Sequence, residues 1–237
     1  AFFKKVIPYY ERKGVLDRTP LRFALELEKL KPTPLRFPGK VLADPDNDRL
    51  FITDSNHNRI VITRRDGQLI DIIGSGEIGD RNGSYTEASF NHPQGLALHG
   101  ETLYVADTEN HLIRKVDLQR KLVGTIAGTG VQARGLWPGI TRDASGAFQM
   151  PKRFVGKPRR TPIASPWALW VHGEDLFIAM AGPHQIWKMP LDLSEIGPYA
   201  GNGREDIVDG LLLPSRPYDL QGQVGGELVS YSSFAQP

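Results

Sequence analysis

The chain repeats itself, and this repeat restricts the fold more than any other feature. A short apolar strand, a polar loop and a second apolar segment recur three times, the first strands reading LFIT from Leu50, LYVA from Leu103 and LFIA from Leu176. Each repeat opens at a proline, namely Pro38, Pro93 or Pro166, and closes in a Gly-x-Gly turn that starts at Gly74, Gly128 or Gly201. Self-similarity of this kind is typical of arrays in which one supersecondary unit stacks on the next.

Each repeat has room for four short strands. In the second repeat we expect them at Gly95–His99, Thr102–Ala106, Leu112–Leu118 and Leu122–Ala127. A four-stranded meander that recurs every ~40–45 residues is typical of the blades of a β-propeller. Blades stack because a lone four-stranded sheet cannot cover both of its faces. The pattern therefore predicts an all-β fold, and a parallel α/β sheet is disfavoured because no helical pattern separates the strands.

The predicted organisation has two parts. Residues 1–36 form a short helical tail and a linker, in which Leu21 to Leu30 have helical spacing and Pro8 is expected to break or kink any helix begun at Phe2. Residues 37–237 form a partial propeller. Its blades are expected at about 38–76, 93–130 and 166–203, with a fourth starting near 234 and insertions at 131–165 and 204–232.

Composition excludes several classes of protein. The chain has 237 residues, of which 24% are charged and 40% hydrophobic, so it is neither disordered nor fibrous. It has no cysteine, which rules out disulfides, a CxxC redox pair and a cysteine-ligated zinc site. No stretch approaches the ~18 apolar residues of a membrane helix, so no membrane insertion is expected. Because the chain starts at Ala1 without a signal-peptide pattern, we expect a piece of a larger protein.

The candidate site residues lie in the polar loop that follows the second strand of each repeat. They are Asp54, His57 and Asn58, then Asp107, Asn110 and His111, and finally His184. Asp and Asn side chains hydrogen-bond nearby backbone, so the favoured interpretation is that these residues pin the blade loops. The alternative is that they converge on a ligand or a partner. Met180 and Pro183 break the pattern in the third repeat, and one His per repeat is weak evidence for zinc, so we expect no metal and no cofactor.

Two further features are a basic run and a set of three tryptophans. The basic run from Lys152 to Arg160 includes Arg153, Arg159 and Arg160, and is favoured to be a solvated loop. Alternatively it binds RNA, although the pI of about 8.8 is below the value typical of a dedicated nucleic-acid domain. Trp167, Trp170 and Trp187 are expected to fill the wedge between blades.

One segment resembles a known repeat. DTENHLIRKVDL at Asp107–Leu118 is similar to the NHL repeat, named for the Asn-His-Leu that stands here at Asn110 to Leu112. The chain also resembles a family that joins a thioredoxin-like domain to an NHL propeller. The segments that carry this resemblance include RLFITDSNHNRIVI, FNHPQGLAL and YYERKGVLDRTPLRFALE, and it covers residues 9–237. The family implies a six-bladed propeller. It also implies a thioredoxin-like domain upstream of Ala1.

The expected role is a non-catalytic protein-interaction scaffold that positions a redox domain. No G-x-S-x-G motif or other catalytic constellation occurs, so this chain is not expected to be an enzyme by itself. The alternatives are a docking segment of a thiol-disulfide oxidoreductase and RNA binding through residues 152–160. The expected partner is the client of the redox domain or the missing half of the propeller. The compartment stays open: cytoplasmic by default, lumenal in chloroplast relatives. Uncovered blade faces predict self-association or poor solubility.

Overall fold

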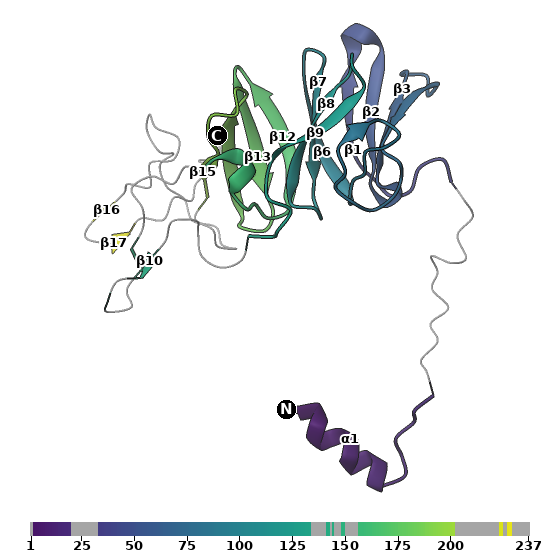
Figure 1. Cartoon of the computed structure of the whole chain (residues 1–237), viewed down its shortest axis with the longest axis vertical. Coiled ribbons are helices and arrows are strands. Elements are labelled where there is room, and N and C mark those ends of the chain that lie inside the picture. Colours follow the sequence, from purple (N-terminus) through teal and green to yellow (C-terminus); the bar gives the residue numbers. More distant parts are fainter. Residues whose placement is uncertain are drawn as a thin grey trace. The chain divides into compact units, whose positions relative to one another are not determined.

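The computed structural model describes residues 2–19, 33–133, 141–142, 144, 148–149, 156–201, 223–224 and 227–228 (Figure 1). The chain divides into two compact units, Ala1–Pro34 and Leu35–Pro237. Several expectations fall outside the described residues: the helix at Leu21 to Leu30, Arg153, most of both insertions and the fourth blade near 234.

The described part of the first unit contains one helix, α1 (Phe2–Arg12). Of the two outcomes expected for Pro8, a break or a kink, the break does not occur, because α1 continues through this proline to Arg12. A proline costs a helix one backbone hydrogen bond and adds a clash with the preceding turn, and here the flanking turns persist in spite of it. None of the helices that the structure describes is long and apolar enough to cross a membrane.

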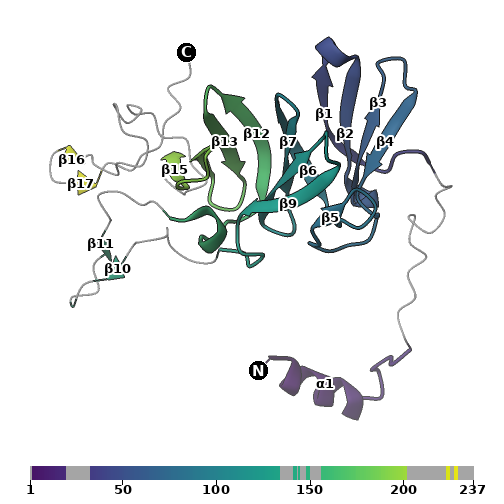
Figure 2. The ribbon, with the colours of Figure 1, turned by 45° about the horizontal axis from the view of Figure 1, so that its top comes forward.

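The described part of the second unit has three larger antiparallel sheets of four or five strands, which we call blades 1, 2 and 3 (Figures 1 and 2). Blade 1 has the strand order β1 (Pro38–Asp44), β2 (Arg49–Asp54), β3 (Arg59–Thr63), β4 (Leu69–Ile73). Blade 2 has the order β5 (Gly83–Ser84), β9 (Leu122–Ala127), β8 (Leu112–Asp117), β7 (Thr102–Asp107), β6 (Pro93–His99). Blade 3 has the order β12 (Pro166–His172), β13 (Asp175–Met180), β14 (Gln185–Pro190), β15 (Gly197–Ala200).

The remaining described elements are short. Three 3-10 turns occur at η1 (Pro45–Asn47), η2 (Ser55–His57) and η3 (Pro158–Arg160). Two separate two-stranded pairs are β10 (Thr141–Arg142) with β11 (Phe148–Gln149) and β16 (Gln223–Val224) with β17 (Glu227–Leu228).

The strands expected for the second repeat agree with β6 to β9 to within two residues. The sequence did not indicate β5, which pairs Gly83 with Val123 at the outer edge of β9. A strand of two residues is too short for an alternating pattern to reveal it. The prediction of an all-β, propeller-like fold is confirmed, while the blade count of a closed propeller stays a prediction.

The core lies between the sheets. One cluster joins Phe51 and Ile60 of blade 1 to Leu103 and Val105 of blade 2. A second cluster joins Tyr104 of blade 2, on the opposite face of β7, to side chains of blade 3 that include Leu176, Ile178, Trp187 and Met189. Alternate residues of β7 therefore pack into two different interfaces between neighbouring blades, which we call seams. The two-residue period of a strand requires this alternation. Blade 2 is covered on both faces, and Figure 2 shows it standing between its neighbours.

The prediction that all three tryptophans fill the wedge between blades holds for only one of them. Trp187 is buried in the second cluster, with 2% of its surface exposed. Trp167 and Trp170 are 44% and 59% exposed, so the prediction is wrong for both. The reason is the orientation of β12, which turns Leu169 and Val171 toward the cluster instead. A register shift between Pro166 and Ala168 re-aims the side chain at position 167.

Candidate interaction site at the blade seams

The residue before each opening proline has an unusual backbone conformation. Phe37, His92 and Ser165 have φ angles of 50°, 48° and 47° respectively. Positive φ is uncommon for residues other than glycine, so a conformation that recurs in three blades has a structural role. It turns the chain sharply into the first strand of each blade and presents the backbone of the next residues to the neighbouring blade.

A hydroxyl group from the preceding blade holds the opening prolines of blades 2 and 3. The Ser55 Oγ donates a hydrogen bond of 2.7 Å to the carbonyl oxygen of Pro93. The Thr108 Oγ1 donates an equivalent bond of 2.6 Å to the carbonyl oxygen of Pro166. Both hydroxyls follow directly on the second strand of their blade. Ala181 stands at the corresponding place in blade 3 and has no hydroxyl to donate.

A second side chain holds the residue before the proline. The Asn58 Oδ1 accepts a hydrogen bond of 3.1 Å from the backbone N–H of His92. The His111 Nδ1 accepts a bond of the same length from the backbone N–H of Ser165. Asn58 and His111 both have positive φ, 51° and 53°. We call this pair of bonds, hydroxyl to proline carbonyl and acceptor to the preceding N–H, the seam clamp.

The clamp sets the protonation state of His111. Because its Nδ1 accepts a hydrogen bond, the imidazole is neutral with its proton on Nε2. Burial lowers the pKa of His111 below its usual range, and the carboxylate of Glu109 opposes that shift. Protonation of His111 would replace the acceptor with a donor and break the clamp.

Asp54 and Asp107 are fully buried and hold the entrance of their own blade. The Asp54 Oδ1 accepts a bond of 2.6 Å from the backbone N–H of Arg36, and its Oδ2 lies 2.7 Å from the His57 Nδ1 and 2.9 Å from the Arg59 Nε. The Asp107 Oδ1 accepts an equivalent bond of 2.8 Å from the backbone N–H of Asn91. Its Oδ2 accepts bonds from the Asn110 Nδ2 and the Arg114 Nη1, at 2.9 and 2.8 Å. Hydrogen bonds and ion pairs within the fold therefore occupy both carboxylates.

Arg114 is a buried partner that the sequence analysis missed. Its guanidinium pairs with Asp107, donates to the carbonyl oxygens of Ser89 and Arg81, and lies over the Phe90 ring at 5.1 Å. Burial raises the pKa of Asp107 to about 6, and the nearby Arg114 charge acts most strongly against that rise. The available signal was that Arg114 alternates with the apolar Leu112 and Val116 along β8 and so shares their inward face.

The structure does not gather the predicted loop residues into one centre, because each blade carries its own set. Asn110 donates to the carbonyl of Gly79 at 2.7 Å, whereas His184 is exposed at a φ of 51°. Arg159 and Arg160 are exposed in η3. Within the described ranges, no group of three or more His, Cys, Asp and Glu side chains is arranged to hold a metal ion.

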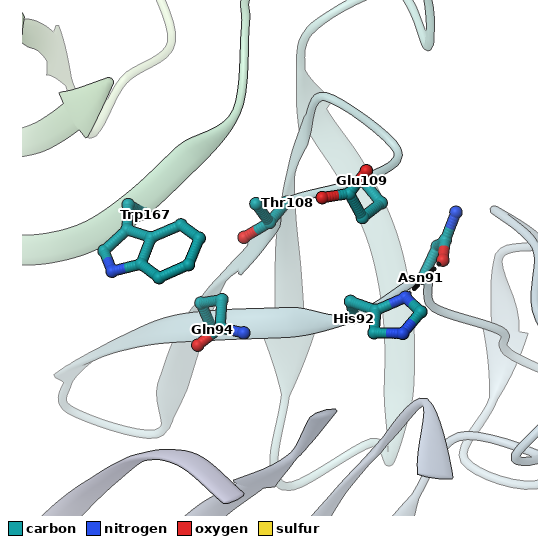
Figure 3. A pocket seen from close by; sticks show the side chains of 6 residues that line it. All are labelled: Asn91, His92, Gln94, Thr108, Glu109 and Trp167. Atoms are coloured by element: carbon teal, nitrogen blue, oxygen red, sulfur yellow. Dashed lines mark hydrogen bonds between the residues drawn. The ribbon is translucent and has the colours of Figure 1, made fainter. Parts of the chain in front are cut away.

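A pocket of about 280 Å³ opens at the seam between blades 2 and 3 (Figure 3). Its lining consists of Asn91, His92, Gln94, Thr108, Glu109 and Trp167. The sequence leads us to expect Trp167 in the wedge between blades, and the other five are not among the candidate site residues of the sequence. The pocket adjoins the seam clamp, since Thr108 belongs to both.

Comparisons with known proteins identify the repeat. Residues 90–116 match the model of the NHL repeat. The chain is 36% identical to NHL repeat-containing protein 2 of Gallus gallus and 41% identical to Protein SUPPRESSOR OF QUENCHING 1, chloroplastic, of Arabidopsis thaliana. Each alignment covers 86% of this chain, which spans 29% of the Gallus protein and 19% of the Arabidopsis protein.

A solved structure shows the same fold. It is a protein of unknown function from Bacteroides thetaiotaomicron, with a TM-score of 0.50 and 18% sequence identity, and the superposition covers 70% of this chain and 38% of that one. Together with the three stacked antiparallel sheets, these similarities place the chain in the NHL-repeat family of β-propellers, alongside NHL repeat-containing protein 2 and SUPPRESSOR OF QUENCHING 1.

Proposed function

We propose that this chain is a non-catalytic protein-interaction scaffold whose binding surface is the blade end that carries the seam clamps. One observation carries the proposal. The conspicuous polar residues Asp54, Asp107 and His111 are engaged in hydrogen bonds inside the fold, while the pocket beside them leaves an indole and a carboxylate open to solvent. Polar residues that build a scaffold are not free for catalysis, and an open aromatic pocket is suited to recognition.

Exposed apolar side chains at the same blade end support the proposal. Phe37, Ile78 and Val131 lie in connections that enter or leave the blades there, Trp167 lies at the start of β12, and all four are exposed. Aromatic residues are enriched at the energetically important centres of protein interfaces. At the opposite blade end, the turn between β8 and β9 exposes the polar side chains of Gln119, Arg120 and Lys121, beside the exposed Leu122.

The finer role follows from the family resemblance. In the intact protein the scaffold would position a thioredoxin-like domain against its client, and the client would be the partner that this blade end binds. The chain has no cysteine, so any thiol chemistry has to come from other residues of the larger protein. If that domain is redox active, this chain is the docking segment of a thiol-disulfide oxidoreductase.

Site-specific photo-crosslinking tests the proposal. A photoreactive residue at Thr129, exposed at the proposed binding end, is compared with one at Gln119, exposed at the opposite end. We expect protein crosslinks from position 129 in the source cells, few from position 119, and loss of the former when Trp167→Ala is added. Equal crosslinking from both positions, crosslinks insensitive to Trp167→Ala, or crosslinks mainly to nucleic acid would overturn it.

A further inference from the structure

The pocket exists because the two seams are filled differently at one position. Gly39, Gln94 and Trp167 each follow the opening proline of their blade. The Gln94 Oε1 lies only 2.2 Å from the place where a Cβ on Gly39 would stand, so the Gln94 side chain fills the seam between blades 1 and 2. Because Gln94 leans toward blade 1, the space between it and Trp167 stays open, and this space is the pocket in Figure 3.

The open groups of the pocket favour a cation. The Trp167 indole forms one wall, and the exposed Glu109 carboxylate lies on the far side of Thr108 from it (Figure 3). Within the described part of the chain, no basic side chain forms an ion pair with Glu109. The face of an indole carries negative charge density and attracts cations. An anionic ligand would meet the repulsion of Glu109, and His92 is the one lining side chain that can carry a positive charge.

The size of the pocket favours a single side chain. Pockets that enclose small-molecule ligands measure roughly 300–1,000 Å³. This pocket, at about 280 Å³, lies at the lower edge of that range and opens on the proposed binding surface. We therefore expect a side chain on the surface of a partner protein to occupy the pocket.

We propose that the pocket receives the guanidinium group of an arginine from the partner protein. The guanidinium stacks on Trp167 and pairs with the Glu109 carboxylate. Arginine fits better than lysine because its planar, weakly hydrated group can stack on a ring and bond a carboxylate with two N–H groups at once. The inference rests on the proposed function and names the chemistry of the partner.

Peptide titration followed by NMR tests the inference. The full chain has four tryptophans, so its labelled indole N–H signals are few, and Trp167→Phe assigns one of them. The probe is the capped peptide Gly-Ser-Arg-Ser-Gly, with matched peptides that carry citrulline, lysine or glutamate instead. We expect the arginine peptide to shift the Trp167 signal saturably and leave the buried Trp187 signal in place. The citrulline peptide, which keeps the planar shape without the charge, should bind at least tenfold more weakly.

Two variants sharpen the test. Glu109→Gln removes an exposed charge without burying anything, so folding is unaffected and binding of the arginine peptide should fall at least tenfold. Trp170→Phe, which changes an exposed tryptophan outside the pocket, should leave binding unchanged. Equal binding of arginine and citrulline peptides, equal binding of the lysine peptide, or insensitivity to Glu109→Gln would overturn the inference.

The two proposals can fail separately. If position 129 crosslinks to a protein but the arginine peptide does not bind, the arginine inference is wrong and the scaffold proposal stands. If position 129 gives no protein crosslinks and the peptide does not bind, both are wrong.

Discussion

The imidazole Nδ1 of His111 accepts a hydrogen bond from the backbone N–H of Ser165 at 3.1 Å, across 54 residues of sequence. Asn58 and His92 are related in the same way across 34 residues. The loop that carries the Asn-His-Leu motif is therefore a device for joining one blade to the next. Its Thr108 and His111 side chains both bond to the adjacent blade.

The His111 bond should contribute measurably to stability. Replacing His111 with Ala removes the acceptor and places a residue without side-chain compensation at a φ of 53°, so we expect a loss of about 1–3 kcal/mol in the free energy of unfolding. His111→Asn restores the residue type found at position 58 and should lose less than half as much. Urea denaturation measures both. An alanine variant as stable as the parent chain would contradict the clamp.

The same bond predicts a pH dependence. Burial lowers the pKa of His111 in the folded chain, so between that value and the ordinary value of about 6.5 the unfolded chain binds more protons. Stability therefore rises with pH in this window and is lost as the pH falls through it. We expect the stability difference between the parent chain and His111→Asn to shrink from pH 7.5 to pH 5.5. Denaturation midpoints that stay parallel across this range would argue against a neutral acceptor.

Close approach of two strands makes Gly95 hard to replace. A Cβ at Gly95 would stand 2.6 Å from the Ala168 Cα and 2.8 Å from the Trp167 carbonyl oxygen, both backbone atoms of blade 3. Gly95→Ala should therefore destabilise the chain by about 2–4 kcal/mol, since neither strand can move without opening the seam. Gly124→Ala is the matched control, because no atom lies within 4 Å of its Cβ position. Similar melting temperatures for the two variants would refute this account.

Replacing the buried Arg114 should lower the free energy of unfolding, because it leaves the buried Asp107 carboxylate unpaired. Arg114→Met leaves Asp107 buried without its cation, and breaking such a pair costs about 3–5 kcal/mol. The double variant Arg114→Met with Asp107→Asn should recover part of that loss, whereas Lys115→Met, at the exposed neighbour, should change little. Calorimetry of the parent chain, the single variants Arg114→Met and Asp107→Asn, and the double variant measures the coupling. Additive losses would mean that the two side chains act independently.

An aromatic row on blade 3 predicts self-association of the isolated chain. Trp170 stacks on His172 with ring centroids 5.0 Å apart and contacts Phe177 at 5.5 Å, and Phe177 contacts Tyr199 at 5.2 Å. Exposed apolar surface of this kind drives association in water. Sedimentation velocity should show concentration-dependent oligomers that Trp170→Ser weakens and that Leu122→Ser, at an exposed position of blade 2, does not. A monodisperse parent chain would contradict the prediction.

Local patterns predicted most of the secondary structure. The strands of blade 2, from Thr102–Asp107 to Leu122–Ala127, are short, largely apolar runs bounded by turn residues, and each of these signals lies within a few residues of the strand that it specifies. The repeats and the Asn-His-Leu motif were sufficient for the family. The sequence left open whether Pro8 breaks or kinks a helix begun at Phe2, and α1 continues through it because a single residue's preference can be outweighed by the turns around it.

Local sequence patterns did not predict the contacts between blades. Whether Trp167 is buried depends on a register shift in β12, and whether a pocket lies beside it depends on how Gln94 leans over Gly39 in the other seam. The burial of Arg114 likewise depends on the carbonyls of Arg81 and Ser89, which lie 33 and 25 residues away. Strands and turns arise from interactions along the chain, which the order of residues displays directly. A seam arises from the meeting of segments far apart in the chain, so its shape and chemistry exist only once the blades have stacked.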